Sequence, residues 1–424
     1  MRMVNKSNNK ALKSITSLGS ATLLNAILAF LVEIINRNIL GPEKYGYWLS
    51  VSLIFTFVPL FQLGTLNAMN REVPFYLARK EFEKVKEIRE TVFSFIYSIP
   101  LSLMVLLFVV SLFLFMSNIH YEYKTGLMFA SVIGFFTYLS GYAEMYYKSE
   151  QNFSKASKLI SIKSISQSII TVIMVSFFGY LGLYIGMLLA LLIEISTARI
   201  TIPRIKKKHS FAEYKDLINI GFPILLVGMV WNVMIATDRI IISLFMSPKD
   251  LGNYGVGMLV FNTMMLLPQV ISQVFYPKIV ELVSKNDYLG IKKIYISVNR
   301  ILAIMMAFIV TIGYFILPYF IMWFMPEYKS GIKTAQILLI GIYPLTLVNV
   351  AANYFNATNN QKLYLTIQVI SIVFNVILCL LFLDFSMSIT SIAEASAICF
   401  TIYSVLMNFS FWMKFKKEVI FNEL

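Results

Sequence analysis

The amino-acid sequence predicts an all-α, polytopic membrane protein with twelve transmembrane helices in two lobes of six. Of its 424 residues, 58% are hydrophobic and 14% are charged, whereas soluble globular proteins carry about 25% charged residues. Runs of about 20 mostly apolar residues recur along the whole chain, and each can cross a hydrocarbon core of about 30 Å as a helix. A turn motif of the first half also returns in the second half, which indicates an internal duplication.

The apolar runs predict where each span begins and ends. The spans of the first half are 14–40, 46–69, 92–116, 125–147, 158–179 and 181–204, and those of the second half are 217–246, 252–277, 298–324, 332–355, 361–384 and 388–413. The predicted domains are therefore an N-terminal lobe (1–204), a basic cytoplasmic linker (205–216) and a C-terminal lobe (217–424). Because each lobe has an even number of spans, both begin on the same side of the membrane.

The repeated turn joins the first two spans of each lobe. Its first copy runs from Leu40 to Trp48 (LGPEKYGYW), and its second copy runs from Met246 to Tyr254 (MSPKDLGNY). In each copy a proline starts the turn, charged residues follow it, and a glycine lets the chain reverse. The alignment pairs Pro42 with Pro248, Gly46 with Gly252, and Trp48 with Tyr254.

The basic residues predict the orientation of the chain. With both termini in the cytoplasm, most of the 36 lysines and arginines fall in or beside cytoplasmic segments, as the positive-inside rule requires. We assign Lys148, Lys155, Lys158 and Lys163, which follow the fourth span, to this cytoplasmic set. The net charge of +14 therefore reflects basic residues that flank membrane spans on the cytoplasmic side, and no nucleic-acid partner is expected. The segment Arg79–Arg89 is expected to be a short amphipathic helix on the inner surface or a solvated connecting helix.

Several features argue against an enzyme. No predicted outer loop is long enough to hold an external substrate. The sequence has no Gly-rich loop ending in Gly-Lys-Ser/Thr, no HExxH motif and no Asp-x-Asp pair. Cys379 and Cys399 lie in apolar spans and predict neither a disulfide nor a metal site. We expect no cofactor, no metal and no catalytic residue.

Ionisable residues within the spans are the main candidates for function, because a charged side chain in hydrocarbon costs about 3 kcal/mol. Glu33 and Arg37 are four residues apart and can meet on one helical face. In the seventh span Asp238 and Arg239 are adjacent, and the repeat places Arg239 at the depth of Glu33. These charges either pair with one another across the lobe interface or line a polar cleft that accepts a charged head group.

Further polar residues extend the candidate substrate site. Arg71 either meets phosphate at the inner mouth or marks the cytoplasmic boundary, and buried amides are most often interhelical hydrogen bonds. The predicted substrate-binding residues are Arg37, Arg239, Arg71, Glu33, Asp238, Asn25 and Asn232. The predicted ion-coupling residues are Glu144, Glu194 and Glu394, of which the last two are roughly equivalent in the two lobes. Packing against polar or basic neighbours is the alternative for each of these carboxylates.

Five short motifs resemble the polysaccharide flippases of the Wzx type, in the multidrug/oligosaccharidyl-lipid/polysaccharide (MOP) exporter superfamily. They are Arg37-x-x-Leu40-Gly41-Pro42-Glu43-x-Tyr45-Gly46, Arg71-x-Val73-Pro74, Gly221-Phe222-Pro223, Asp238-Arg239-Ile240-Ile241-Ile242 and Leu251-Gly252-x-Tyr254. The resemblance implies a two-lobed, V-shaped, MATE-like carrier that works by alternating access. Lipid II flippases of the superfamily typically carry extra C-terminal helices, so that branch is disfavoured.

The resemblance also implies substrate and partners. The substrate would be an undecaprenyl-pyrophosphate-linked oligosaccharide, moved to the outer leaflet for O-antigen (lipopolysaccharide), capsule or exopolysaccharide assembly. Its partners would be membrane lipids, H⁺ or Na⁺, and the polysaccharide polymerase machinery. A cation-coupled multidrug exporter of the same superfamily is the alternative, since Glu33 and Asp238 would suit cationic drugs. A membrane enzyme of glycan assembly and a purely structural scaffold fit the sequence less well.

Overall fold

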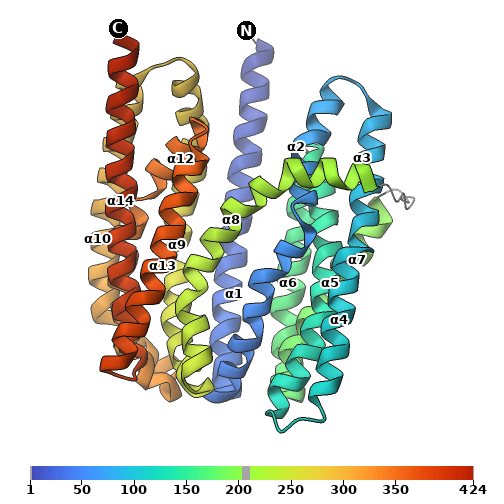
Figure 1. The fold of residues 1–424 in the computed structure, drawn as a ribbon, viewed down its shortest axis with the longest axis vertical. Coiled ribbons are helices and arrows are strands. Elements are labelled where there is room, and N and C mark those ends of the chain that lie inside the picture. The colour runs from blue at the N-terminus through green and yellow to red at the C-terminus, as the bar shows by residue number, and fades with distance from the viewer. Residues whose placement is uncertain (1, 203–210, 424) are drawn as a thin grey trace. The chain divides into compact units, whose positions relative to one another are not determined.

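The computed structural model describes residues 2–202 and 211–423, and within these ranges it contains helices and no strand. The predicted all-α class is confirmed. The chain forms two compact units. We call them the N-unit (Met1–Leu40 and Tyr47–Met229) and the C-unit (Gly41–Gly46 and Val230–Leu424), and Figure 1 shows the helices of each.

The N-unit is built from the first eight α-helices and one short 3-10 helix. They are α1 (Arg2–Phe57), η1 (Val58–Gln62), α2 (Thr65–Ala78), α3 (Phe82–Ile96), α4 (Ile99–Leu114), α5 (Tyr121–Ser149), α6 (Phe153–Phe178), α7 (Tyr180–Thr201) and the first part of α8 (Phe211–Phe245). Gly41 interrupts α1 with a non-helical backbone (φ 72°, ψ 171°). In Figure 1 the chain descends along the first arm of α1 and returns along the second.

The C-unit contains the rest of α8 and the helices that follow it. They are α9 (Pro248–Ser284), α10 (Tyr288–Phe324), η2 (Pro326–Gly331), α11 (Ile332–Thr346), α12 (Asn349–Ala357), α13 (Gln361–Phe385) and α14 (Ile389–Glu423). Ser247 caps α9 in a capping box: its hydroxyl accepts the Asp250 N–H, and the Asp250 carboxylate accepts the Ser247 N–H. This reciprocal pairing satisfies two backbone donors that a helix start leaves free.

The helices agree with the predicted spans. Among the described residues, ten helices are long and apolar enough to cross a membrane, and the bent pair Asn25–Gln62 and Thr65–Ala78 raises the number to eleven. The two arms of α1, on either side of Gly41, account for the first two of the twelve predicted spans. The protein is therefore a multi-pass helical membrane protein.

Three predicted spans are each made of two helices. The second span bends by 48° between η1 and α2, where Leu63 and Gly64 have positive φ angles of 50° and 82°. The third breaks at Tyr97 and Ser98 between α3 and α4, and the tenth breaks between α11 and α12. Pro100 and Pro344 lie beside the last two breaks, as expected because proline removes a helical hydrogen bond.

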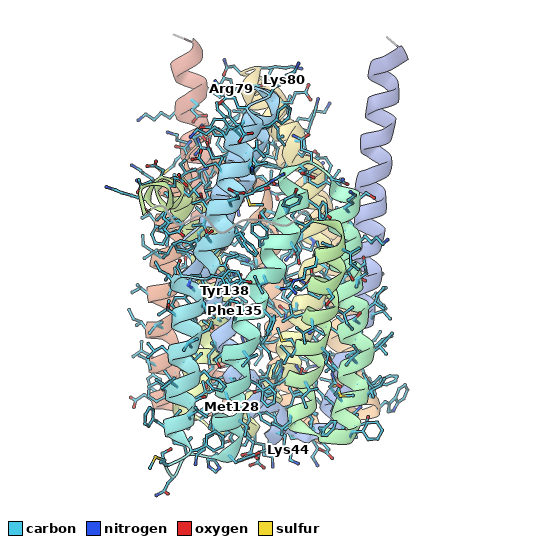
Figure 2. The ribbon with its side chains drawn as sticks, turned by 90° about the vertical axis from the view of Figure 1, so that its right-hand side faces the viewer. Lys44, Arg79, Lys80, Met128, Phe135 and Tyr138 are labelled. Atoms are coloured by element: carbon cyan, nitrogen blue, oxygen red, sulfur yellow. The ribbon has the colours of Figure 1, made fainter. Side chains whose placement is uncertain are left out.

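The segment predicted as a surface or connecting helix belongs to the N-unit bundle. α3 begins at Phe82, and its apolar residues Val85 and Ile88 are buried in one cluster with Met69 and Val73 of α2. Val85 and Ile88 therefore contact protein, whereas Phe82 is 64% exposed, and the location of this helix at the inner membrane surface stays a prediction. Figure 2 shows Arg79 and Lys80, in the turn before α3, at one end of the helices.

The N-unit extends past the predicted linker into α8. The Thr91 hydroxyl of α3 donates to the Glu213 carboxylate at 2.6 Å, and the rings of Phe95 and Tyr214 lie 5.2 Å apart, edge to face. These contacts hold the start of α8 against α3, so the boundary between the units falls at Met229–Val230. Residues 205–210 of the predicted linker lie outside the described residues.

The two copies of the repeated turn pack against each other within the C-unit. A Cβ atom added to Gly46 would lie 1.6 Å from the Pro248 carbonyl oxygen, and one added to Gly252 would lie 1.8 Å from the Pro42 carbonyl oxygen. The two backbones can approach this closely only because neither glycine has a side chain. The aligned prolines and glycines of the repeat are therefore partners in space as well as in sequence.

Candidate functional site

The first group of predicted site residues lies on the first arm of α1. Arg37 Nη2 is 3.7 Å from Glu33 Oε2, so the ion pair predicted from their four-residue spacing is present. The Arg37 side chain is buried with only 2% exposed, whereas the Glu33 side chain is 40% exposed. Asn25 Nδ2 donates to Ser161 Oγ at 3.4 Å and connects α1 to α6. A buried arginine in an apolar helix is a costly feature and marks this arm as a candidate site.

The second group lies on α8, in the C-unit. Asp238 is buried; its carboxylate accepts the hydroxyl of Tyr254 on α9 and, at 2.7 Å, the backbone N–H of Arg239. Asp238 therefore points into the helix bundle of the C-unit, where each of its two carboxylate oxygens accepts a hydrogen bond. Arg239 is partly buried and Asn232 is exposed.

Arg71 lies on α2, and its side chain is 64% exposed. Its Nε atom is 3.6 Å from the Glu72 carboxylate beside it. The structure thus groups Arg37, Glu33 and Asn25 on α1, and groups Asp238 with Arg239 on α8. A shared site formed by these groups with Arg71 and Asn232 stays a prediction.

The predicted ion-coupling residues Glu144 and Glu194 come together in the N-unit. Glu144 is near the end of α5 and Glu194 is on α7, and Lys163 of α6 reaches both carboxylates. Lys163 Nζ donates to Glu144 Oε1 and lies 3.6 Å from Glu194 Oε2. One ammonium group thereby connects three neighbouring helices, α5, α6 and α7. Such pairing is expected, because a charged side chain among apolar helices is costly unless it has a partner of opposite charge.

Ser140 completes this cluster, which we call the Lys163 cluster (Ser140, Glu144, Lys148, Lys163 and Glu194). The Ser140 hydroxyl donates to Glu194 Oε2 at 2.5 Å and accepts from Lys163 Nζ at 3.1 Å. Lys148 Nζ lies 3.0 Å from Glu144 Oε2, so Glu144 has two basic partners. The Glu194 side chain is 0% exposed.

Lys163 is a functional candidate that the sequence does not single out. Its predicted place is among the cytoplasmic basic residues, but in the structure it contacts Glu144 and Glu194 within the bundle. The signal was present: Lys163 lies inside the predicted span 158–179, and a basic residue inside a span requires an acidic partner. A cytoplasmic lysine is solvated and needs no acidic partner, so the positive-inside rule alone does not indicate the contacts of Lys163.

Glu394 does not share the environment of Glu194. It is exposed on α14, whereas Glu194 is fully buried on α7. The rough equivalence predicted from their spacing therefore does not extend to their surroundings.

The described residues contain no group of three or more His, Cys, Asp or Glu side chains arranged to hold a metal ion. The two cysteines are free and buried. Cys379 donates to Asn375 Oδ1 at 3.4 Å and Cys399 donates to the Ser371 carbonyl at 3.2 Å. Both thiols therefore act as weak donors in the C-unit core.

Comparisons with known proteins agree with this architecture. A family model described as "Polysaccharide biosynthesis protein" matches residues 11–283. No curated protein matches the sequence. Among solved structures, an inward-facing multidrug resistance MATE family transporter of the MOP superfamily has a TM-score of 0.75 and 12% sequence identity, covering 93% of this chain and 95% of that one.

Two further structures extend the comparison. The lipid II flippase MurJ, in an inward closed conformation, has a TM-score of 0.72 and 16% identity, covering 93% of this chain and 87% of that one. An outward-facing MATE family transporter has a TM-score of 0.67 and 12% identity, covering 96% of both chains. At such identities the likeness shows the fold, and the predicted MATE-like fold is confirmed.

Proposed function

Because this chain belongs to the polysaccharide biosynthesis protein family, we propose that it is a flippase for lipid-linked oligosaccharides. Its substrate is an undecaprenyl-pyrophosphate-linked repeat unit, which it moves from the inner to the outer leaflet by alternating access. The product supplies O-antigen, capsule or exopolysaccharide assembly. The protein lies in the bacterial cytoplasmic membrane with both termini inside, as the distribution of its basic residues indicates.

The observation that carries this proposal is the family match over residues 11–283, in a chain with the MATE-like fold. Buried charge adds a physical reason. A pyrophosphate cannot enter hydrocarbon without compensation, because transfer of an isolated ionised group costs far more than a protein's whole stability. Arg37, buried on an apolar helix, is the residue we propose to bind the pyrophosphate.

The transport cycle needs an energy source, and we propose a gradient of H⁺ or Na⁺ that acts through a buried carboxylate. Glu194 fits this role best, because it is fully buried. Glu394 fits it least, because it is exposed. A polysaccharide polymerase would then receive the product on the outer face.

The proposed function is tested by the pool of lipid-linked oligosaccharide in a strain that lacks this protein. We expect repeat units to accumulate on the cytoplasmic face while surface polysaccharide disappears. The second candidate is a multidrug exporter, which the likeness to a multidrug resistance MATE transporter favours. If the protein is a drug exporter, the strain that lacks it should keep its surface polysaccharide and become more sensitive to cationic dyes. Accumulation of unpolymerised units on the outer face would instead indicate an enzyme of glycan assembly.

Arg37→Ala tests the substrate-binding arginine. We expect surface polysaccharide to fall about ten- to hundredfold at equal protein level, because a charge-assisted hydrogen bond contributes about 1.5–3 kcal/mol. Arg37→Lys, which keeps the charge, is expected to retain part of the activity. The control is Arg300→Ala, since Arg300 is exposed on α10. Unchanged polysaccharide in Arg37→Ala would remove Arg37 from the proposed site.

A further inference from the structure

The Lys163 cluster contains two carboxylates and two ammonium groups, but the two carboxylates do not share the cations equally. The side chains of Glu194, Glu144, Lys163 and Lys148 are 0%, 16%, 25% and 35% exposed, so Glu194 is the most deeply buried of the four. Both ammonium groups are hydrogen-bonded to Glu144, whereas Glu194 has Lys163 at 3.6 Å. An ionised carboxylate inside a helix bundle is unfavourable unless it has a charged partner. A proton on Glu194 would remove the charge of the carboxylate that has the weaker cation contact.

The geometry indicates which carboxylate holds that proton. Lys163 Nζ is hydrogen-bonded to Glu144 but lies 3.6 Å from Glu194, and Lys148 adds a second cation to Glu144. Among the described residues, the Ser140 hydroxyl donates to Glu194 Oε2, and the Lys163 ammonium faces the same oxygen at the longer distance of 3.6 Å. Its other oxygen, Oε1, is buried and has no hydrogen-bond partner in the described part of the chain. A bare oxygen of an ionised carboxylate is costly in that position, and a proton removes the charge that makes up most of this cost, leaving the smaller cost of a neutral O–H group without an acceptor.

We propose that Glu194 is a proton-binding site, which carries one proton on Oε1 while Lys163 is held by Glu144. When the proton leaves, the carboxylate becomes charged and attracts the ammonium of Lys163 from Glu144 towards Glu194. Lys148 remains on Glu144, so Glu144 is not left without a cation. The hydroxyl of Ser140, which contacts both Lys163 and Glu194, lies on the path of this movement.

The charged groups around Glu194 come from both helices packed against α7. They are Glu144 and Lys148 on α5 and Lys163 on α6. A metal cation such as Na⁺ would stand close to the Lys163 ammonium and be repelled by it. It would also need several oxygen ligands, whereas the free Oε1 has no polar neighbour at hydrogen-bond distance among the described residues. A proton needs only that one oxygen. The site therefore selects H⁺, and its use in transport rests on the proposed function.

The test is infrared difference spectroscopy of the purified full-length protein in lipid nanodiscs, with pH varied at constant salt. We expect a carboxylic-acid C=O band that disappears as the pH rises, is absent in Glu194→Gln and is unchanged in Glu394→Gln, its exposed counterpart. In Lys163→Met the pH at which half of the band has disappeared is expected to rise, because ionised Glu194 loses its cation. The rise should correspond to proton binding that is at least about tenfold tighter. Ser140→Ala should shift the band in the same direction, and it provides a second test if Glu194→Gln does not fold.

Two results would overturn the proton site: a band that persists in Glu194→Gln, or a band that Na⁺ removes at fixed pH. Because proton binding is measured without substrate, its failure leaves the flippase proposal intact. Conversely, a strain without the protein that keeps its surface polysaccharide would reject the flippase function and leave the proton site standing.

Discussion

Gly252→Ala is expected to destabilise the C-unit severely. The added Cβ atom would lie 1.8 Å from the carbonyl oxygen and 2.7 Å from the carbonyl carbon of Pro42. Both are backbone atoms, so no side-chain rotation can relieve the overlap. We expect a cost of about 3 kcal/mol, the upper end of the range for overpacked sites, measured as a lower melting temperature of the purified protein in detergent.

Two variants make this result specific. Gly46→Ala should behave like Gly252→Ala, because its Cβ would lie 1.6 Å from the Pro248 carbonyl oxygen. Gly228→Ala is the matched control: it lies within α8, and its added Cβ would meet no atom within 4 Å. Alanine favours a helix over glycine by about 1 kcal/mol, so this variant should melt no lower than wild type. Equal stability of Gly252→Ala and Gly228→Ala would contradict the close packing of the two turns.

The repeated turn shows how far the sequence predicts this fold. Proline and glycine at matching places predicted two turns, but α9 starts at Pro248, four residues before the predicted span start at 252. Gly46 and Gly252 lie inside helices, so the prediction that these glycines reverse the chain is wrong; the non-helical backbone of the first turn is at Gly41. The sequence could not predict that the two turns pack against each other, because local turn chemistry describes only neighbours along the chain. The breaks in three spans had local signals in Gly64, Pro100 and Pro344, which hydropathy averaged over a window does not resolve.

The candidate site was predicted best where it depends on a single helix. The spacing of Glu33 and Arg37 predicted their ion pair, because residues four apart share a helical face. Pairing between helices was harder, since it depends on how the helices rotate and pack. The sequence therefore indicated Glu144 and Glu194 one by one but did not predict that they share Lys163. The contact of Asp238 with Tyr254 was missed for the same reason.

Lys163→Met is expected to destabilise the N-unit bundle strongly. Methionine has a similar length but no charge, so the variant leaves the buried carboxylates without the cation between them. Breaking a buried pair by removing one partner costs about 3–5 kcal/mol. Since Lys148 still contacts Glu144, we expect a value near the lower end, about 3 kcal/mol, measured as a lower melting temperature. Lys158→Met, at an exposed position on the same helix, is the control and should have little effect.

A second substitution shows which carboxylate carries the charge. If Glu194 holds a proton at neutral pH, Lys163→Met strands only the charge of Glu144. Adding Glu144→Gln should then recover most of the lost stability, whereas adding Glu194→Gln should recover little. At high pH Glu194 is ionised as well. Glu144→Gln and Glu194→Gln should then both be needed to recover the stability lost in Lys163→Met. Rescue by Glu194→Gln alone at neutral pH would place the ionised charge on Glu194 and argue against the proton-bound state.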